Sequence, residues 1–354
     1  MTTSKHIARW ALAAVLGAAG PAAFETPASA ADMVYRKSAP RAVLLGDLTL
    51  TRETVTVAPR GLNPVTVPVD DIARIEWERE PAAFKTARAA EASGKLAEAL
   101  AQYEKELPNT SGNAAIDTQF LIARATAKLA LVDPSRANDA IARLEAFRAA
   151  HPDNFRHFAA LEHLGEVFLA SGQFDKARAA FGELEKSSSP ALRMGALNAK
   201  ARVLQKEGKN DEALAAFDAV IQQPAESPAE LSRRHEAMLG RAKCLMAQAK
   251  YGEAVTALDT VIDDVAPTDT RNQATAYVLM GDSLRALDKE KDARLAYLHV
   301  DVLFQQERPQ HAEALYHLAR LWSALGDQER ANDAAARLSK EHPQSEWARK
   351  LTSG

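Results

Sequence analysis

Residues 161–184 read LEHLGEVFLASGQFDKARAAFGEL, and residues 197–220 read LNAKARVLQKEGKNDEALAAFDAV. Both stretches place small and apolar residues at the same spacings around a glycine, which is Gly172 in the first and Gly208 in the second. On each side of the glycine the apolar residues recur three and four positions apart, as they do on one face of a helix. Each stretch therefore predicts a hairpin of two amphipathic helices with a tight turn at the glycine.

The hairpin pattern recurs along residues 81–350. An alanine marks the second helix of each copy, at Ala99, Ala140, Ala177, Ala213, Ala254, Ala293 and Ala331, with 36 to 41 residues between neighbours. A small residue recurs on the first helix, where a large side chain would separate the two helices, at Gly165, Ala201, Ala242, Gly281 and Ala319. One hairpin leaves an apolar face uncovered, and the next hairpin buries it. About seven hairpins are therefore expected to stack into one continuous array.

The composition agrees with closely packed helices. Of 354 residues, 73 are alanine and only 6% are aromatic, whereas sheet cores are rich in aromatic and β-branched residues. A coiled coil is the main alternative fold, but the glycines and prolines between the helices would interrupt a sustained heptad pattern. An enzyme built as an α/α-barrel is a further alternative.

The marker positions resemble those of the tetratricopeptide repeat family, whose standard unit has about 34 residues. The resemblance covers residues 81–350. It implies a mainly α fold, a right-handed α-α superhelix whose concave side is lined by the first helix of each hairpin. The sequence departs from the family pattern because its repeats lack the family's tryptophan and its longer units must extend loops or helices. The full lysine and asparagine set with which chaperone-binding members hold a carboxylate cannot be placed here, so chaperone binding is not expected.

A different pattern occupies residues 31–80. Valine alternates with threonine at residues 54–57, and apolar residues alternate with other residues at 65–69 and at 74–77. Period-two alternation broken by turn residues predicts three or four short strands between Ala42 and Glu78. Pro64 and Pro68 indicate edge strands, because proline cannot donate to a strand ladder. We expect a small β-rich unit that caps the helical body; a separate binding module or an oligomerisation edge is the alternative.

Residues 1–30 have the features of a secretory signal peptide. A basic start precedes an apolar run from Trp10 to Ala19, and Ala28, Ser29 and Ala30 form a small-residue cleavage site. The run is shorter than the roughly 20 residues that span a membrane. We therefore expect cleavage after Ala30 and a periplasmic or secreted protein with no transmembrane segment. An uncleaved anchor or a buried amphipathic helix is the alternative.

Charge, cysteine content and motifs exclude several kinds of site. The formal net charge is −3, so no overall basic field attracts nucleic acid. Cys244 is the only cysteine, which excludes an intramolecular disulfide and a multi-cysteine zinc site. His157 and His163 are six residues apart, as are His311 and His317, so neither pair shares one helix face. The sequence contains no phosphate-binding glycine loop, nucleophile elbow or His-Glu-x-x-His motif. We expect no enzyme activity, no cofactor and no metal; a hydrolase assembled from distant residues is the alternative.

The family resemblance implies that exposed positions of the first helices line a groove. These positions include Asn198, Arg202, Lys206, Lys243, Arg285, Tyr316 and Arg320. Arg202, Lys206 and Lys243 are expected to form a basic patch that pairs with an acidic peptide or a C-terminal carboxylate. The alternative is that these residues form an ordinary solvated helix face.

Together these features predict a non-catalytic protein–protein interaction scaffold or adaptor in the bacterial cell envelope. Its partner would be another envelope protein or a peptide bound in the concave groove. The end of the array, residues 338–348, is similar to the repeat ends of bacterial envelope-assembly and cell-division tetratricopeptide proteins. The alternative is a glycan-associated or polysaccharide-export accessory factor, although Trp77, Trp322 and Trp347 are scattered in the sequence. A structural oligomer that pairs its strand edges is a third alternative, and the oligomeric state stays open.

Overall fold

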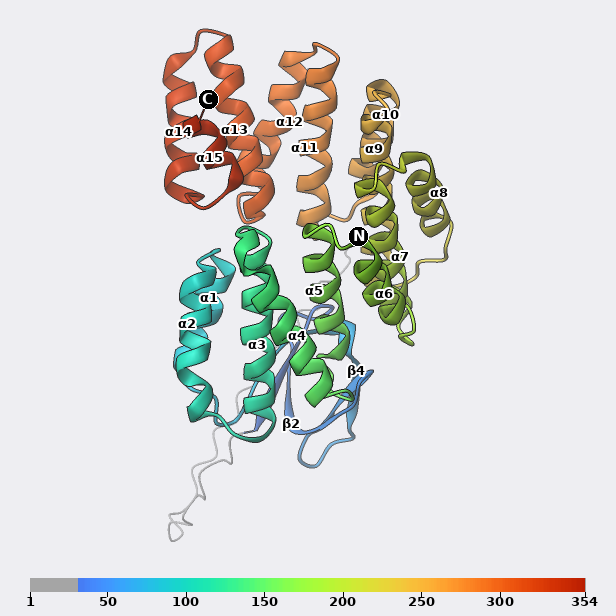
Figure 1. Ribbon diagram of the computed structural model, residues 1–354, viewed down its shortest axis with the longest axis vertical. Helices are drawn as coiled ribbons and strands as arrows, with labels where there is room; N and C mark the ends of the chain where they lie inside the picture. Colours follow the sequence, from blue (N-terminus) through green and yellow to red (C-terminus); the bar gives the residue numbers. More distant parts are fainter. Residues whose placement is uncertain (1–30, 354) are drawn as a thin grey trace, which may run out of the picture.

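The computed structural model describes residues 31–353. The predicted signal peptide and its cleavage point after Ala30 lie outside the described residues. Within the described range, a small antiparallel sheet precedes a curved array of stacked helical hairpins (Figure 1). The predicted mainly α architecture with a β-rich start is therefore confirmed. Among these residues, no helix has both the length and the apolar character needed to cross a membrane.

The sheet has five strands: β1 (Asp32–Arg36), β2 (Val43–Leu50), β3 (Thr54–Ala58), β4 (Val65–Pro68) and β5 (Ile72–Glu76). Their order is β4-β3-β2-β1-β5, and every neighbouring pair is antiparallel. β4 lies at one edge, as Pro68 predicted. β1 precedes the region in which the sequence indicated strands. Its five residues include a single fully buried side chain, that of Val34, which is too little alternation to reveal a strand.

Seven helical hairpins follow the sheet within the described range, as the repeat pattern predicted. They are α1 (Ala83–Ala92) and α2 (Leu96–Glu106), α3 (Gly112–Ala130) and α4 (Ala137–Ala150), α5 (His157–Ala170) and α6 (Phe174–Leu184), α7 (Pro190–Lys206) and α8 (Asn210–Ile221), α9 (Pro228–Ala247) and α10 (Tyr251–Asp264), α11 (Thr270–Ala286) and α12 (Glu290–Leu303), and α13 (Arg308–Ala324) and α14 (Gln328–Glu341). A last helix, α15 (Glu346–Ser353), packs against α13 and α14. Three short 3-10 helices, Val69–Asp71, Leu107–Asn109 and Pro134–Arg136, lie in the connections.

Small residues allow the helices to approach closely. The marker alanines of all seven hairpins are buried, and six of them have no exposed surface. Gly165 of α5 lies against the ring of Phe181 on α6, and a Cβ atom on this glycine would be 2.3 Å from the ring. Gly281 of α11 lies in the same way against Tyr297 of α12, at 2.6 Å. Carbon atoms in contact are about 3.5–4.0 Å apart, so a larger residue would force the two helices apart, as the sequence pattern predicted.

The turn between the two helices of a hairpin uses a left-handed backbone conformation. Gly94, Gly172, Gly208 and Gly326 have positive φ at this position, and Ala249 takes φ 59° there. The amide that follows Ala249 donates to the carbonyl five residues before it, Lys250 N to Leu245 O at 2.9 Å. This bond closes the end of the first helix in a Schellman motif. The turn geometry is therefore kept even where the sequence lacks glycine.

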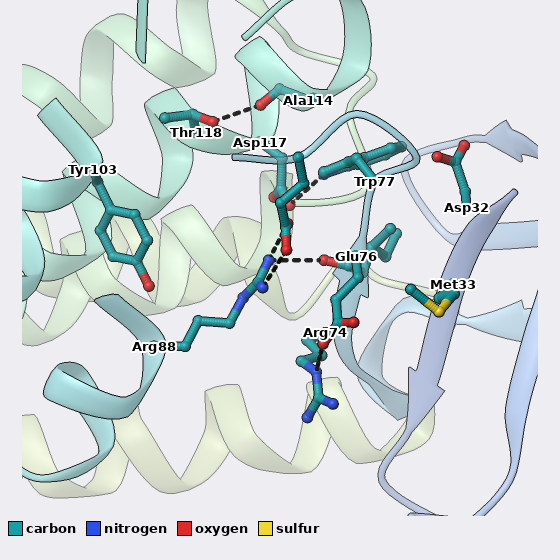
Figure 2. A network of polar contacts seen from close by, with 12 residues as sticks. Asp32, Met33, Arg74, Glu76, Trp77, Arg88, Tyr103, Ala114, Asp117 and Thr118 are labelled. Carbon is teal, nitrogen blue, oxygen red and sulfur yellow. Dashed lines mark hydrogen bonds and ion pairs between the residues drawn. The ribbon is translucent and has the colours of Figure 1, made fainter. Parts of the chain in front are cut away.

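The sheet is fixed to the first helices by an apolar core and by buried polar contacts. Its inward valines pack with Ala114 of α3 and with Phe155, which precedes α5. Trp77, just after β5, donates from Nε1 to Asp117 Oδ2 of α3 at 3.0 Å, as Figure 2 shows. At the other end of the sheet, Glu53 accepts a hydrogen bond from Ser187 at 3.0 Å. The β-rich unit therefore packs directly on the helical body.

The two ends of the superhelix come together. Figure 1 shows α13 to α15 directly beyond α1 to α3 along the long axis. Arg308, at the start of α13, lies against the turn between α1 and α2, where a Cβ atom on Gly94 would be 3.0 Å from its Nε. The array of hairpins therefore brings its first and last repeats into contact.

Candidate functional site

The first helices of the hairpins converge on the inside of the superhelix. Arg233 of α9 reaches across α7 to Glu162 of α5, with 3.5 Å between Nη2 and Oε1. It also pairs with Glu236 of its own helix at 3.0 Å. Gly195 of α7 leaves the space for this crossing, since a Cβ atom there would be 3.1 Å from the Arg233 guanidinium. A contact between helices two repeats apart identifies these helices as the concave surface.

Asn198 does not belong to the exposed groove surface that the sequence analysis assigned to it. Its side chain is buried, and its Nδ2 donates to the backbone oxygen of Arg233 at 2.7 Å. Asn272 of α11 makes the equivalent bond to Ser232 O at 3.1 Å. These amides join neighbouring first helices, and Asn198 is not available to a partner.

Arg202 lies in the groove but is already paired. Its guanidinium donates to both carboxylate oxygens of Glu166 on α5, at 3.2 Å from Nη1. Burial opposes the charge of Arg202, yet the attraction of Glu166 raises the pKa of the guanidinium above its ordinary value. The predicted basic patch therefore loses one member to an internal ion pair.

Lys206 and Lys243 remain available on α7 and α9. Both are exposed, and neither has a hydrogen bond or ion pair to a residue in 31–353. The groove walls remove part of the hydration of Lys243, and this burial lowers its pKa, as does the repulsion of Arg202 and Lys206. The negative charges of Glu313 and Asp282 act in the opposite direction. Lys243 therefore lies in a groove that carries both signs of charge.

Two acidic side chains lie within range of Lys243, on α11 and α13. Asp282 accepts a hydrogen bond from Tyr297 Oη at 2.6 Å. Glu313 makes no hydrogen bond or ion pair with any residue that the structure describes. Burial raises the pKa of Glu313 to about 7, and the charge of Asp282 adds to this effect. Glu313 is thus an unpaired carboxyl group that gains or loses its proton near neutral pH.

The remaining predicted groove residues form an aromatic and cationic cluster on α11, α13 and α15. Arg285 donates from Nη1 to His317 Nδ1 at 2.9 Å. Arg320 is exposed and donates to Tyr316 Oη at 2.9 Å. The Tyr316 ring centroid is 5.1 Å from that of Trp347 on α15. Beside this cluster, residues of α13, α14 and α15 line an open cavity of about 520 Å³.

The structure places side chains of metal-ligand type together in two clusters that the sequence spacing did not reveal. They are Asp282, Glu313 and His317, and His311, Glu341 and His342. Burial lowers the pKa of His317 to about 3, and Arg285 occupies its Nδ1. In the second cluster, ring nitrogens of His342 and His311 are 2.9 Å apart, and His311 Nε2 is 2.9 Å from Asp301 Oδ1. These hydrogen bonds use ring nitrogens that a metal would need.

Sequence reasoning missed Arg233 and Glu313. Arg233 occupies the same position in α9 that Gly195 occupies in α7, five residues after the first residue of each helix. A glycine in one repeat and an arginine at the equivalent position of the next repeat are a signal that could have indicated the contact between Arg233 and Glu162 across α7. Glu313 has no comparable signal in the sequence, because its place near Lys243 depends on how α13 approaches α9.

These hairpins, with their left-handed turns and nested small residues, define an α-solenoid built from helical repeats. Family models described as tetratricopeptide repeat match residues 129–194 and 198–270, and a second such model matches residues 313–345. The chain is therefore a tetratricopeptide repeat protein. No curated protein matches the sequence.

Several solved structures are similar to the chain. A tetratricopeptide repeat protein from Parabacteroides merdae is 15% identical over 76% of this chain and 95% of its own, with a TM-score of 0.48. A Rap protein, complexed with Competence and Sporulation Factor, is 16% identical over 76% and 78%, with a TM-score of 0.49. PilW, a type IV pilus biogenesis factor, is 18% identical over 65% and 98%, with a TM-score of 0.41.

Proposed function

We propose that the protein is a non-catalytic scaffold of the bacterial cell envelope that binds a peptide, or a segment of another envelope protein, in its concave groove. The observation that carries this proposal is the contrast between paired and unpaired charges on the concave surface. Arg202 and Arg233 are satisfied by internal acids. Lys206, Lys243 and Glu313 have no such partner among the described residues.

The unpaired groups suit an extended segment of mixed charge. A carboxylate of the segment would pair with Lys206 and Lys243, since charge-assisted hydrogen bonds are the strong ones. A backbone amide or a cation would face Glu313 and favour its ionised form. Solenoids of helical repeats use their concave surfaces in this way. Export to the envelope is supported by the pattern of residues 1–30.

A double charge reversal tests the groove. Lys206→Glu with Lys243→Glu should abolish capture of the partner from the exported fraction, identified by mass spectrometry. Lys291→Glu with Lys340→Glu is the matched control, because both lysines are exposed on second helices. The control should recover the same partner as the wild type. Equal recovery of the partner by both double variants would show that the groove lysines do not bind it. Recovery of the protein from the cytosol alone would exclude the cell envelope as its location.

A glycan-binding role is the second candidate, because the structure brings together aromatic residues that are scattered in the sequence. Tyr316 and Trp347 lie beside a cavity that also exposes Gln328 and Asn332. Exposed aromatic rings and side-chain amides are common in saccharide recognition. Binding of envelope oligosaccharides that Trp347→Ala abolishes, with unaltered binding in Lys206→Glu/Lys243→Glu, would favour this role over the peptide scaffold.

A further inference from the structure

A second polar site lies where the sheet meets the first helices, separate from the groove residues described above. An open cavity of about 250 Å³ is lined by residues of β5, α1 and α3 and by Arg156, which precedes α5. Five cationic side chains line it, namely Arg74, Arg88, Arg124, Lys128 and Arg156, together with only two acidic ones, Glu91 and Asp117. Figure 2 shows Arg88 of α1 reaching toward β5 with Asp117 of α3 beside it, whereas the Arg74 guanidinium at the rim points away from both.

The two acids of the cavity are already engaged. Asp117 is buried and accepts from Trp77 Nε1 at 3.0 Å and from Arg156 Nε at 2.8 Å. Glu91 accepts from Arg124 at 2.6 Å and from Lys128 at 2.8 Å. Tyr103 donates a third hydrogen bond to Glu91 at 3.2 Å. Neither acid therefore has much remaining capacity to accept from the other donors of the cavity.

The cations of the cavity, in contrast, have donors left over. The Nε of Arg124 is buried and has no hydrogen-bond acceptor. Arg88 is matched by Glu80, at 2.5 Å from Nη1, and also donates to the backbone of β5. Arg74 bonds Glu76 from Nε alone, at 2.8 Å, while its guanidinium lies over the Tyr35 ring. A desolvated donor without an acceptor costs free energy, so the cavity favours an acceptor group from outside.

The exposure of the side chains distinguishes the rim of the cavity from its floor. Arg74 and Lys128 are 45% and 40% exposed, and they form its rim. Arg156 and Asp117 are 9% and 2% exposed, and they form its floor. The charges of Arg156 and Asp117 on the floor neutralise each other, whereas the rim is basic. An anion is therefore attracted to the mouth of the cavity and held there.

We propose that this cavity binds one oxyanion group, a carboxylate or a phosphate, with Arg74, Arg124 and Lys128 as its donors. Guanidinium groups hold such anions through paired hydrogen bonds. The volume suits a small anion or an acidic side chain better than a drug-sized ligand. Because Arg74 belongs to the sheet and the other two donors belong to α3, the anion joins the β-rich unit to the helical array.

Isothermal titration calorimetry of the purified protein tests the proposal at constant ionic strength. One arm uses inorganic phosphate, and the other uses N-acetylglutamate as the carboxylate. The test variant is Arg74→Gln with Lys128→Gln. The control is Arg136→Gln, whose arginine is also exposed but pairs with Asp133 outside the cavity. We expect at least one anion to bind the wild type and the control equally, and to bind the double variant about tenfold more weakly or worse.

Each outcome has a defined meaning. Binding of phosphate alone identifies a free phosphate or a phosphorylated ligand, and binding of N-acetylglutamate alone identifies an acidic side chain of a partner. Absence of binding in both arms, or equal affinity in the double variant, overturns the proposal, and water then fills the cavity. Circular dichroism checks the fold of the double variant. If that variant does not fold, Arg74→Gln alone provides the comparison, because this exposed residue has a single ion pair.

Discussion

Replacing Gly165 by alanine adds one methyl group where α5 and α6 are closest. The new Cβ would lie 2.3 Å from Cε1 and 2.6 Å from Cζ of Phe181. Contact between carbon atoms requires about 3.5 Å, so the ring or the helix must move by about 1 Å. Overpacking of this kind costs about 1–3 kcal/mol, and the better helix propensity of alanine returns up to about 1 kcal/mol. We expect Gly165→Ala to lower the free energy of unfolding by about 1–2 kcal/mol.

Urea unfolding followed by far-ultraviolet circular dichroism measures this change. Gly182→Ala is the matched control, because the nearest atoms to its added Cβ belong to the Lys200 side chain, 3.9 Å away. The control should be stabilised by up to about 1 kcal/mol, so the same substitution has opposite signs at the two positions. In a Phe181→Leu background, Gly165→Ala should cost less, since the two residues interact. A Gly165→Ala protein as stable as the wild type would refute the close packing of the hairpin.

Four further substitutions test the turns, the repeat register and the ion pairs of Glu91. Ala249→Gly should stabilise the protein by about 1 kcal/mol, because Ala249 has φ 59°. Gly208→Ala should destabilise it by a similar amount, because it places a side chain at the same left-handed position. If the urea midpoints of the two variants moved in the same direction, the shared turn geometry would be contradicted. Ala213→Leu should cost about 1–3 kcal/mol through overpacking of a fully buried position, and an unchanged melting temperature would contradict the repeat register. Burial opposes the ionisation of Glu91, but Arg124 and Lys128 hold its pKa at about 2, below 4.5. This depressed pKa corresponds to about 3 kcal/mol that is present above pH 4.5 and is lost as the pH falls toward 2. The stability difference between the wild type and Glu91→Gln should therefore shrink over that range, and a difference that does not depend on pH would argue against the ion pairs.

The hairpins could be predicted from the sequence because each depends on residues that are close along the chain. Gly172, the alanine five positions later and Phe181 belong to one hairpin, and their spacing is repeated. The strand edge at Pro68 is likewise a local consequence, since proline lacks an amide donor. β1 could not be recognised, because one buried valine in five residues carries too little periodicity.

The groove was harder to predict, because it depends on how neighbouring hairpins rotate against each other. Asn198 and Arg202 are four residues apart on the same helix, yet one is buried against α9 and the other lies in the groove. The ion pair from Arg233 to Glu162 joins residues 71 positions apart. The contact between His311 and His342 similarly requires α13 and the end of α14 to meet. Such contacts follow from the superhelical twist, which the repeat spacing alone does not determine.

Site-specific photo-crosslinking in living cells tests most directly whether the concave groove is the binding surface. A photoreactive amino acid replaces Lys243 in the groove or Leu295 on the second helix α12, where Leu295 is 53% exposed. We expect a discrete adduct with an envelope protein or peptide from position 243 and none from position 295. An adduct from position 295 with none from position 243 would contradict this expectation.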